Sequence, residues 1–412
     1  MNFQHPRWGA PPWKVNFTPS RHKLPAHTDF AIIGGGFTGL AAAAWLRLLA
    51  PEKSVAVFEA ARIGAGASGR TGGMVLAETA AGNQPGLGDV VAGFRSIVEK
   101  LKVGCDLKLN GAWEIARKSG SGKAKQQQSP IVWNDSGTLR VVNEVAGGAL
   151  DPGKLVTGLA RAAQRHGAQI HENHRVQHVS WSAKPELHVV NACGPAQEIN
   201  EQKITAQKII FATNALSLAE ASLTGMHPRL TLAVLTSPVS EKALAAIGLA
   251  QRKPFYTVDF PYLWGRVRRD RSIVWGAGLV QSPDADDLEK VDIAAEESAA
   301  AFDRLEDRIR HLHPALAKIK FASRWGGPIL FRDSWKPVFD WHPESVAAEP
   351  SDPSRGSTTG AASRTQRGAP RNAIVLGAYA GHGVALSSYF GAWAAEVLLD
   401  RRQLPHWSAL RP

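Results

Sequence analysis

Cysteine is scarce, since Cys105 and Cys193 are the only two among 412 residues. Two cysteines form at most one bridge, which excludes a small secreted scaffold held together by disulfides. With 44% apolar and 20% charged residues, the composition also excludes disordered and collagen-like chains. A single hydrophobic core stops growing at about 250–300 residues, so this length predicts a globular protein of two domains.

Long hydrophobic runs are lacking as well. The first 28 residues contain five prolines and four basic residues, and no apolar run of the kind that forms a secretion signal. Between Asp29 and Arg47 the chain is uncharged for 17 residues. Glycines interrupt this stretch and it is short for a bilayer crossing, so a buried strand, a turn and a helix explain it better. We therefore expect a cytoplasmic protein without a transmembrane segment.

Acidic residues are outnumbered by basic ones, 36 to 48, which gives a net charge of +12. Such a balance raises nucleic acid, a membrane surface or an acidic substrate as partners. Three segments with few residues that pack (1–28, 117–128 and 347–371) hold twelve basic and two acidic residues, and thus +10 of this charge. We expect these segments to be poorly packed. Nucleic acid is therefore not an expected partner.

Strand and helix patterns alternate along much of the chain. The expected elements are a strand ending at Ile33, helices at 41–49 and 152–165, and strands at 55–58, 176–181, 187–190 and 209–212. This alternation predicts an α/β sheet with parallel strands. From about 220 to 345 the pattern predicts an α+β second domain. It has a strand at 272–275 and a helix, with apolar residues from Phe302 to Leu312, that ends at Pro314.

The most informative stretch is a glycine-rich turn. Gly34, Gly36 and Gly39 form a GxGxxG pattern between an apolar strand and an Ala-rich helix, and Glu59 ends the next strand. Gly34 permits a tight turn, Gly36 permits close approach to a pyrophosphate and Gly39 permits close helix packing. The helix N-terminus attracts the anion, and Glu59 lies where a carboxylate accepts hydrogen bonds from a ribose. The sequence therefore predicts a dinucleotide site.

Further blocks identify the type of dinucleotide by resemblance. They read GAGASGRTGGMV at 64–75, GALDPGKLVTGLARAAQRHGAQI at 148–170, IIFATNA at 209–215 and GAYAGHGVAL at 377–386. Together with the first turn, they resemble the D-amino-acid-oxidase-like family of FAD-dependent oxidoreductases from about residue 29 to 400. The GASGR and RWGGP blocks are most similar to its gamma-glutamylputrescine oxidase-like members.

The resemblance implies a Rossmann-like FAD-binding domain interleaved with an α+β substrate domain, as in glycine oxidase. The FAD-binding domain would consist of residues 29–100, 148–219 and 371–402, and the substrate domain of 101–147 and 220–346. Residues 1–28 would be an N-terminal extension, and 347–370 a flexible insertion.

The resemblance also implies the FAD contacts. Ser68 and Arg70 would approach the phosphate and ribityl region, and residues 71–74 the flavin ring. Val176 would contact the adenine, with an ordinary core position as an equal alternative. Residues 381–385 would present a helix N-terminus to the reduced flavin. The expected contacts are Gly34, Gly36, Phe37, Thr38, Gly39, Glu59, Ala60, Ser68, Gly69, Arg70, Thr71, Gly72, Gly73, Met74, Val176, Ala212, Thr213, Gly381, His382, Gly383, Val384 and Ala385. Relatives that tether FAD through histidine carry it where Arg70 stands, so we expect non-covalent FAD.

The substrate side departs from the amino-acid oxidases of the family. Their carboxylate-binding arginine corresponds to Ile329 here, which favours an amine or a substrate whose carboxylate lies elsewhere. Arg266 matches a family arginine that faces the cleft, although a surface strand arginine is an equal alternative. Tyr262, Trp264 and Trp325 are candidates for an aromatic wall, with core packing as the alternative. His382 is either a base or a positioning group.

We therefore predict an FAD-dependent oxidoreductase that oxidises the C–N bond of an amine or amino-acid-like substrate, with His382, Arg266 and Trp325 as catalytic candidates. Oxygen or a quinone would reoxidise the flavin. The alternatives are a D-amino-acid or glycine oxidase or dehydrogenase, a tRNA side-chain-modifying flavoprotein, and a flavoprotein with a structural cofactor. The histidines at 166–178 lie on predicted FAD-domain elements without cysteine ligands, so we expect no metal site.

Overall fold

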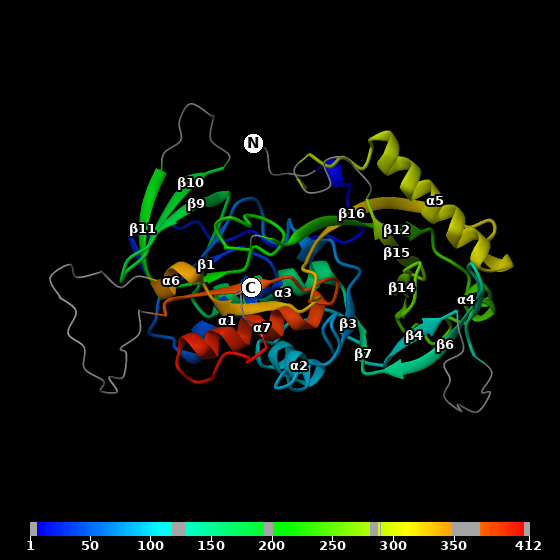
Figure 1. The fold of residues 1–412 in the computed structure, drawn as a ribbon, viewed down its shortest axis with the longest axis horizontal. Coiled ribbons are helices and arrows are strands. Elements are labelled where there is room, and N and C mark those ends of the chain that lie inside the picture. Colours follow the sequence, from blue (N-terminus) through cyan, green and yellow to red (C-terminus); the bar gives the residue numbers. More distant parts are fainter. Residues whose placement is uncertain are drawn as a thin grey trace, which may run out of the picture.

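A computed structural model describes residues 6–117, 129–192, 201–223, 225–280, 287–288, 290–347 and 371–407. Two large β-sheets dominate these residues, with a layer of helices against one of them (Figure 1). Residues 118–128 and 348–370, which make up most of two segments expected to be poorly packed, lie outside the described part. None of the described helices is long and apolar enough to span a membrane.

The first sheet has a parallel centre. Its strands follow the order β17 (Val338–Trp341), β18 (Ala373–Gly377), β11 (Glu201–Phe211), β1 (His27–Ile33), β2 (Val55–Glu59) and β8 (Gln169–Glu172). The five strands from β18 to β8 run parallel, which confirms the predicted α/β sheet. β17 is antiparallel to β18.

The parallel prediction is wrong for two strands. β9 (His174–Ser180) and β10 (Glu186–Asn191) correspond to the strand-like runs at 176–181 and 187–190, but β10 pairs antiparallel with both β11 and β9. Only five residues connect β9 to β10, and a parallel crossover needs a dozen or more. These strands therefore form an antiparallel extension of the sheet.

Four helices pack beside the first sheet: α1 (Phe37–Leu49), α2 (Val90–Lys100), α3 (Pro152–Arg165) and α7 (Gly383–Leu398). Figure 1 shows them grouped together below the sheet. α1 starts four residues before the predicted helix, and α3 has the predicted bounds. A Cβ on Gly391 would collide with the backbone oxygen of Thr38, so α7 crosses the first turn of α1 in close contact. The crossing brings both helices to the same edge of the sheet.

The second sheet is mainly antiparallel. Its order is β16 (Phe321–Phe331), β12 (His227–Thr236), β15 (Ile273–Leu279), β14 (Trp264–Val267), β13 (Phe255–Thr257), β4 (Ala112–Ala116), β6 (Thr138–Val145) and β5 (Val132–Asn134). α5 (Glu296–Leu312) buries its apolar side against this sheet and ends before Pro314, as predicted. The short elements are α4 (Glu241–Ala246), α6 (Pro343–Ala347), β3 (Met74–Leu76) paired with β7 (Gly147–Ala149), and the 3₁₀ turns η1 (Pro6–Trp8), η2 (Ala67–Gly69) and η3 (Pro314–Leu316).

The expectation of a poorly packed N-terminal segment is wrong around Trp8 and Trp13, whereas residues 18–27 are mostly exposed. Trp8 is fully buried and Trp13 is 7% exposed. Trp8 donates its indole N–H to the carbonyl of Leu288 at 3.0 Å, and Trp13 donates to the carbonyl of Gly69 at 2.7 Å. The prolines keep this segment extended, while its tryptophans pack on residues that are distant in the sequence.

Candidate functional site

A long cleft opens at the carboxyl ends of the parallel strands, where sheets of this kind bind ligands. Ile33, Phe58 and Ala212, at or just after the ends of β1, β2 and β11, line it. Segment 64–72, the start of α7 and strands β12, β14 and β16 of the second sheet complete the lining. The cleft contains about 1750 Å³ of space not filled by protein atoms, open solvent at its mouth included. It therefore extends from one sheet to the other.

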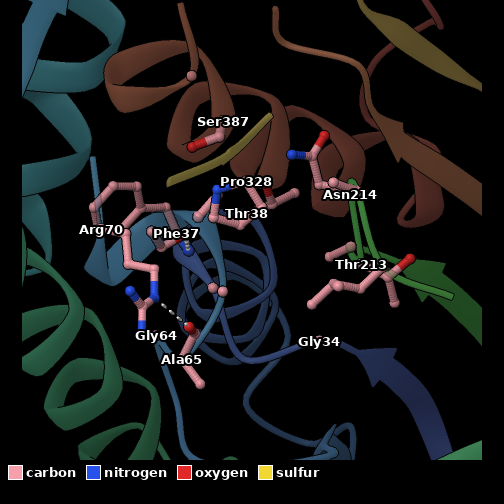
Figure 2. A pocket seen from close by; sticks show the side chains of 18 of the residues that line it. Gly34, Phe37, Thr38, Gly64, Ala65, Arg70, Thr213, Asn214, Pro328 and Ser387 are labelled. Carbon is pink, nitrogen blue, oxygen red and sulfur yellow. Dashed lines mark hydrogen bonds between the residues drawn. The ribbon is translucent and has the colours of Figure 1, made fainter. Parts of the chain in front are cut away.

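The glycine-rich turn forms one wall of the cleft. Gly34 has a φ of +111°, and a Cβ there would lie 2.6 Å from the carbonyl oxygen of Ala212. A Cβ on Gly39 would collide with the backbone oxygen of Gly34, so this glycine packs the helix on the turn and does not line the cleft. α1 begins at Phe37, and its N-cap Gly36 provides no side-chain cap. Gly34, Phe37 and Thr38 line the cleft beside this N-terminus (Figure 2), as does Gly36. The helix start suits an anionic ligand.

The carboxylate of Glu59 lies at the end of β2. Its Oε2 accepts a hydrogen bond from the backbone N–H of Gly35 at 2.7 Å, and its Oε1 accepts one from Ala61 at 2.9 Å. Burial raises the pKa of Glu59, the two backbone bonds lower it, and the nearby charge of Glu172 raises it again. Each carboxylate oxygen keeps a second acceptor position for a ribose hydroxyl. Ala60 and Val176 line the cleft at this same end.

The segment 64–74 approaches the N-terminus of α1. Ser68 Oγ accepts a hydrogen bond from the backbone N–H of Phe37 at 2.9 Å, and a Cβ on Gly36 would lie 2.7 Å from that oxygen. Ser68, Arg70, Thr71 and Gly72 line the cleft, whereas Gly69, Gly73 and Met74 do not.

Gly72 is in contact with an aromatic side chain. A Cβ there would lie 2.7 Å from Cη2 of Trp264, whose indole also lines the cleft. A planar flavin at van der Waals distance would by itself favour glycine here. The structure adds a second requirement, since the ring of Trp264 already occupies the space next to Gly72.

The C-terminal block surrounds the start of α7. Gly381, Gly383 and Val384 line the cleft, whereas His382 and Ala385 do not. His382 is the N-cap residue of α7, and its Nδ1 lies 3.4 Å from the carbonyl oxygen of Ala380. Burial lowers the pKa of His382, so its imidazole is neutral at pH 7. This position is typical of a residue that shapes the helix start.

The end of the cleft next to the second sheet is largely apolar. Trp264, Ala233, Pro328, Ile329 and Leu330 line it, so the residue at the family's arginine position is in the cleft. Tyr262 does not line the cleft; it belongs to the partly buried residues around Tyr256.

Arg266 and Trp325 lie behind the cleft lining. Arg266 is 6% exposed and its Nε donates to the carbonyl of Gly72. Burial lowers the pKa of this guanidinium to about 10. It is therefore neither a cleft-facing arginine nor a surface one. Trp325 is fully buried and donates its indole N–H to the carbonyl of Arg70 at 2.9 Å.

Several cleft residues were missed by the sequence reasoning. Asn214 links β11 to β18 because its Oδ1 accepts a hydrogen bond from the N–H of Ala378 at 3.0 Å. Ser387, on α7, lines the cleft with a buried Oγ that has no hydrogen-bond partner among the described residues, and Thr213 Oγ1 is in the same situation (Figure 2). Both Asn214 and Thr213 lie in the IIFATNA block, and the asparagine was passed over. Nothing in the sequence marked Ser387.

These features fit FAD. The N-terminus of α1 suits the diphosphate and Glu59 suits the ribose. The hydroxyls of Thr213 and Ser387 are buried in the cleft lining without a hydrogen-bond partner among the described residues, so they are available to a ligand. The described residues contain no group of three or more His, Cys, Asp or Glu side chains that could hold a metal ion.

Comparisons with known proteins agree with this fit. The sequence matches the DAO family, described as FAD dependent oxidoreductase, over residues 29–397. It is 25% identical over 356 residues to gamma-glutamylputrescine oxidoreductase from Escherichia coli strain K12, an overlap of 76% of each chain. L-Amino acid deaminase from Proteus myxofaciens has a TM-score of 0.67 at 13% identity over 94% of both chains. Glycine oxidase from Geobacillus kaustophilus has a TM-score of 0.64 at 17% identity, over 94% of this chain and 98% of that one.

The family match covers most of the chain, and the solved structures share the fold. The chain is therefore an oxidoreductase that belongs to the DAO family of FAD-dependent enzymes.

Proposed function

We propose that the protein oxidises a C–N bond of an amine, with loss of hydride from the adjacent carbon and hydrolysis of the resulting imine. The observation that carries this proposal is the apolar lining of the cleft next to the second sheet, where Ile329 replaces the family's carboxylate-binding arginine. Arg266 does not compensate, because its guanidinium is buried against Gly72. Of the described residues that line this end, Arg70 is the basic one, and backbone carbonyls occupy its guanidinium.

When bound, FAD supplies the hydride acceptor, its N5 atom. In this proposal the chain binds and orients both reactants. Trp264 and Ile329 pack on the alkyl part of the amine and exclude water from the reacting carbon. The N-terminus of α7, at Gly383 and Val384, stabilises negative charge that develops beside it. A neutral amine needs no protein base for this step, which agrees with the placement of His382 outside the cleft lining.

The site residues are part of the same proposal. Those that line the cleft contact FAD directly, while Gly39, Gly69, Gly73, Met74 and Ala385 shape the segments that do. We assign Arg266, Trp325 and His382 to positioning, since each supports a segment of the cleft. Arg70 occupies the position of the tethering histidine of some relatives and forms no such bond, so FAD would be dissociable.

We also propose the division into an FAD-binding domain (29–100, 148–219 and 371–402) and a substrate domain (101–147 and 220–346). The two sheets support it, with one difference. β17 falls in the second range but pairs with β18 of the first sheet.

An anaerobic substrate panel tests this function. The similarity to a gamma-glutamylputrescine oxidoreductase suggests gamma-glutamylputrescine and putrescine as amines, with ornithine as the α-carboxylated counterpart of putrescine. We expect the amines to bleach the flavin absorbance at least tenfold faster than ornithine or glycine. Faster bleaching by the amino acids would overturn the proposal. Admission of oxygen afterwards distinguishes an oxidase, which forms peroxide, from a dehydrogenase that needs a quinone.

The variant Ile329→Arg provides a second test of the same proposal. A guanidinium in the apolar end of the cleft should bind a substrate carboxylate. We expect it to slow flavin reduction by putrescine and to speed reduction by ornithine. Loss of both activities with normal FAD binding would show that Ile329 does not select between the two classes.

A further inference from the structure

The N-terminal segment 6–16, called the strap below, connects the second sheet to α3. At one end the carbonyl of Arg7 accepts a hydrogen bond from the N–H of Ile293 at 2.8 Å, and Gly9 forms a β-bridge with Trp325. At the other end the N–H of Asn16 donates to Oγ1 of Thr157 on α3 at 3.0 Å. Between these ends the strap contacts residues 64–73, called the cofactor loop below, which line part of the cleft.

Two tryptophans hold consecutive carbonyls of the cofactor loop. Trp13, from the strap, donates its indole N–H to the carbonyl of Gly69 at 2.7 Å, and Trp325, from β16, donates to the carbonyl of Arg70 at 2.9 Å. The two indole rings meet edge to face with centroids 5.5 Å apart. Because buried carbonyls need donors, the conformation of the loop depends on both side chains.

Arg70 makes the reverse connection, from the loop to the strap. Its Nη1 donates to the carbonyls of Trp8 at 3.2 Å, Gly9 at 2.8 Å and Gly326 at 3.3 Å. Its Nε donates to the carbonyl of Ala65 at 3.3 Å, the dashed contact in Figure 2. Burial lowers the pKa of Arg70 to about 10, so the guanidinium stays charged at pH 7 and its hydrogen bonds are charge-assisted. One buried cation thus joins the strap, the loop and β16.

We propose that the strap holds the cofactor loop in its FAD-binding conformation, with Trp13 and Arg70 as positioning residues, so that docking of the strap and binding of FAD stabilise each other. The physical basis is that the loop places Ser68 at the N-terminus of α1 and lines the cleft with residues 64–68 and 70–72. A ligand that binds only the docked arrangement favours docking, and docking favours the ligand by the same factor. The coupling is independent of the substrate that the enzyme oxidises.

A matched pair of substitutions tests this coupling. Trp13→Phe and Trp133→Phe each remove one buried indole N–H, but Trp133 lies on β5 and its partner is the carbonyl of Ile247, outside both the strap and the loop. The Kd of FAD is measured from its release by the diluted holoenzyme, which FAD fluorescence reports. We expect Trp13→Phe to raise this Kd about fivefold, the equivalent of one hydrogen bond, and Trp133→Phe to leave it within twofold. Equal changes in both variants, or none in Trp13→Phe, would overturn the proposal.

Limited trypsin digestion tests the coupling in the unaltered protein. The side chain of Lys14 is exposed, but its backbone packs against α3, where a Cβ on Gly153 would lie 3.0 Å from its carbonyl carbon. Cleavage after Lys14 therefore requires the strap to undock. We expect FAD to slow this cleavage at least tenfold, while cleavage after the exposed Lys242 on α4 changes less than twofold. Equal slowing at both sites, or at neither, would refute the coupling.

Discussion

The contact between Gly72 and Trp264 gives the sharpest test of how the two sheets shape the cleft. The indole is the cross-strand neighbour of Gly276 on β15, and a Cβ on Gly276 would lie 2.7 Å from its Nε1. A Cβ on Gly72 would lie 2.7 Å from Cη2 of the same ring. The ring of Trp264 thus packs against two glycines, Gly72 and Gly276. A movement of the ring away from one glycine disturbs its packing against the other.

The substitution Gly72→Ala forces one of these neighbours to move. Overpacking of this kind costs about 1–3 kcal/mol of unfolding free energy. Trp264→Leu replaces the ring with a smaller side chain and so removes the obstacle. The double variant Gly72→Ala/Trp264→Leu should therefore have an unfolding free energy about 1–2 kcal/mol higher than the sum of the two single effects predicts. Gly276→Ala should couple to Trp264→Leu in the same direction. Urea unfolding of the holoenzyme variants measures each free energy.

The control is Gly104→Ala, because a Cβ there would have no neighbour within 4 Å. It should change the unfolding free energy by less than about 0.5 kcal/mol. Additivity of Gly72→Ala and Trp264→Leu to within about 0.5 kcal/mol would refute the argument, since it would mean that the loop absorbs the methyl group without touching the ring.

Three further outcomes follow from the cleft. FAD affinity should fall as the pH drops through the raised pKa of Glu59, because protonation removes an acceptor for the ribose. The variant Glu59→Gln should bind FAD weakly at every pH, which titrations of the apoprotein with FAD at several pH values would measure. Ser387→Ala should raise the Kd of FAD several-fold. Ser388→Ala should not, because its hydroxyl, which is also buried without a partner among the described residues, lies outside the cleft lining. His382→Gln should slow anaerobic flavin reduction by less than tenfold with an unchanged pH profile; a loss above a hundredfold would identify a base.

Features with a local cause were predictable from the sequence. A strand, a turn and a helix within 30 residues fix how Gly34 and Glu59 lie, because the chain connecting them is short. The position of Ile329 followed from its place within a recognised block. The direction of Arg266 did not, since alternate residues of a strand point to opposite faces and the sequence does not say which face meets the cofactor loop.

The N-terminal segment also shows that contacts between residues remote in the sequence are hard to predict from local composition. Its prolines and basic residues resemble those of disordered chains, yet Trp8 and Trp13 are large apolar side chains that such chains rarely carry. Their partners, Leu288 and Gly69, are remote in the sequence, so only the fold reveals these contacts. A pair of tryptophans in a proline-rich terminus was the available signal of packing.

The role of glycine in the cofactor loop also changes once these contacts are known. A flavin ring explains why side chains are disfavoured at Gly72, but the collision with Trp264 arises inside the protein itself. Trp264 comes from the second sheet, and the carbonyl of the same glycine accepts a hydrogen bond from Arg266 on the same strand. The second sheet therefore holds the loop in place from behind while it also lines the end of the cleft next to it. A substitution of Trp264 that changes packing on the substrate side of the cleft should therefore alter the rate of FAD release as well as the KM for the amine.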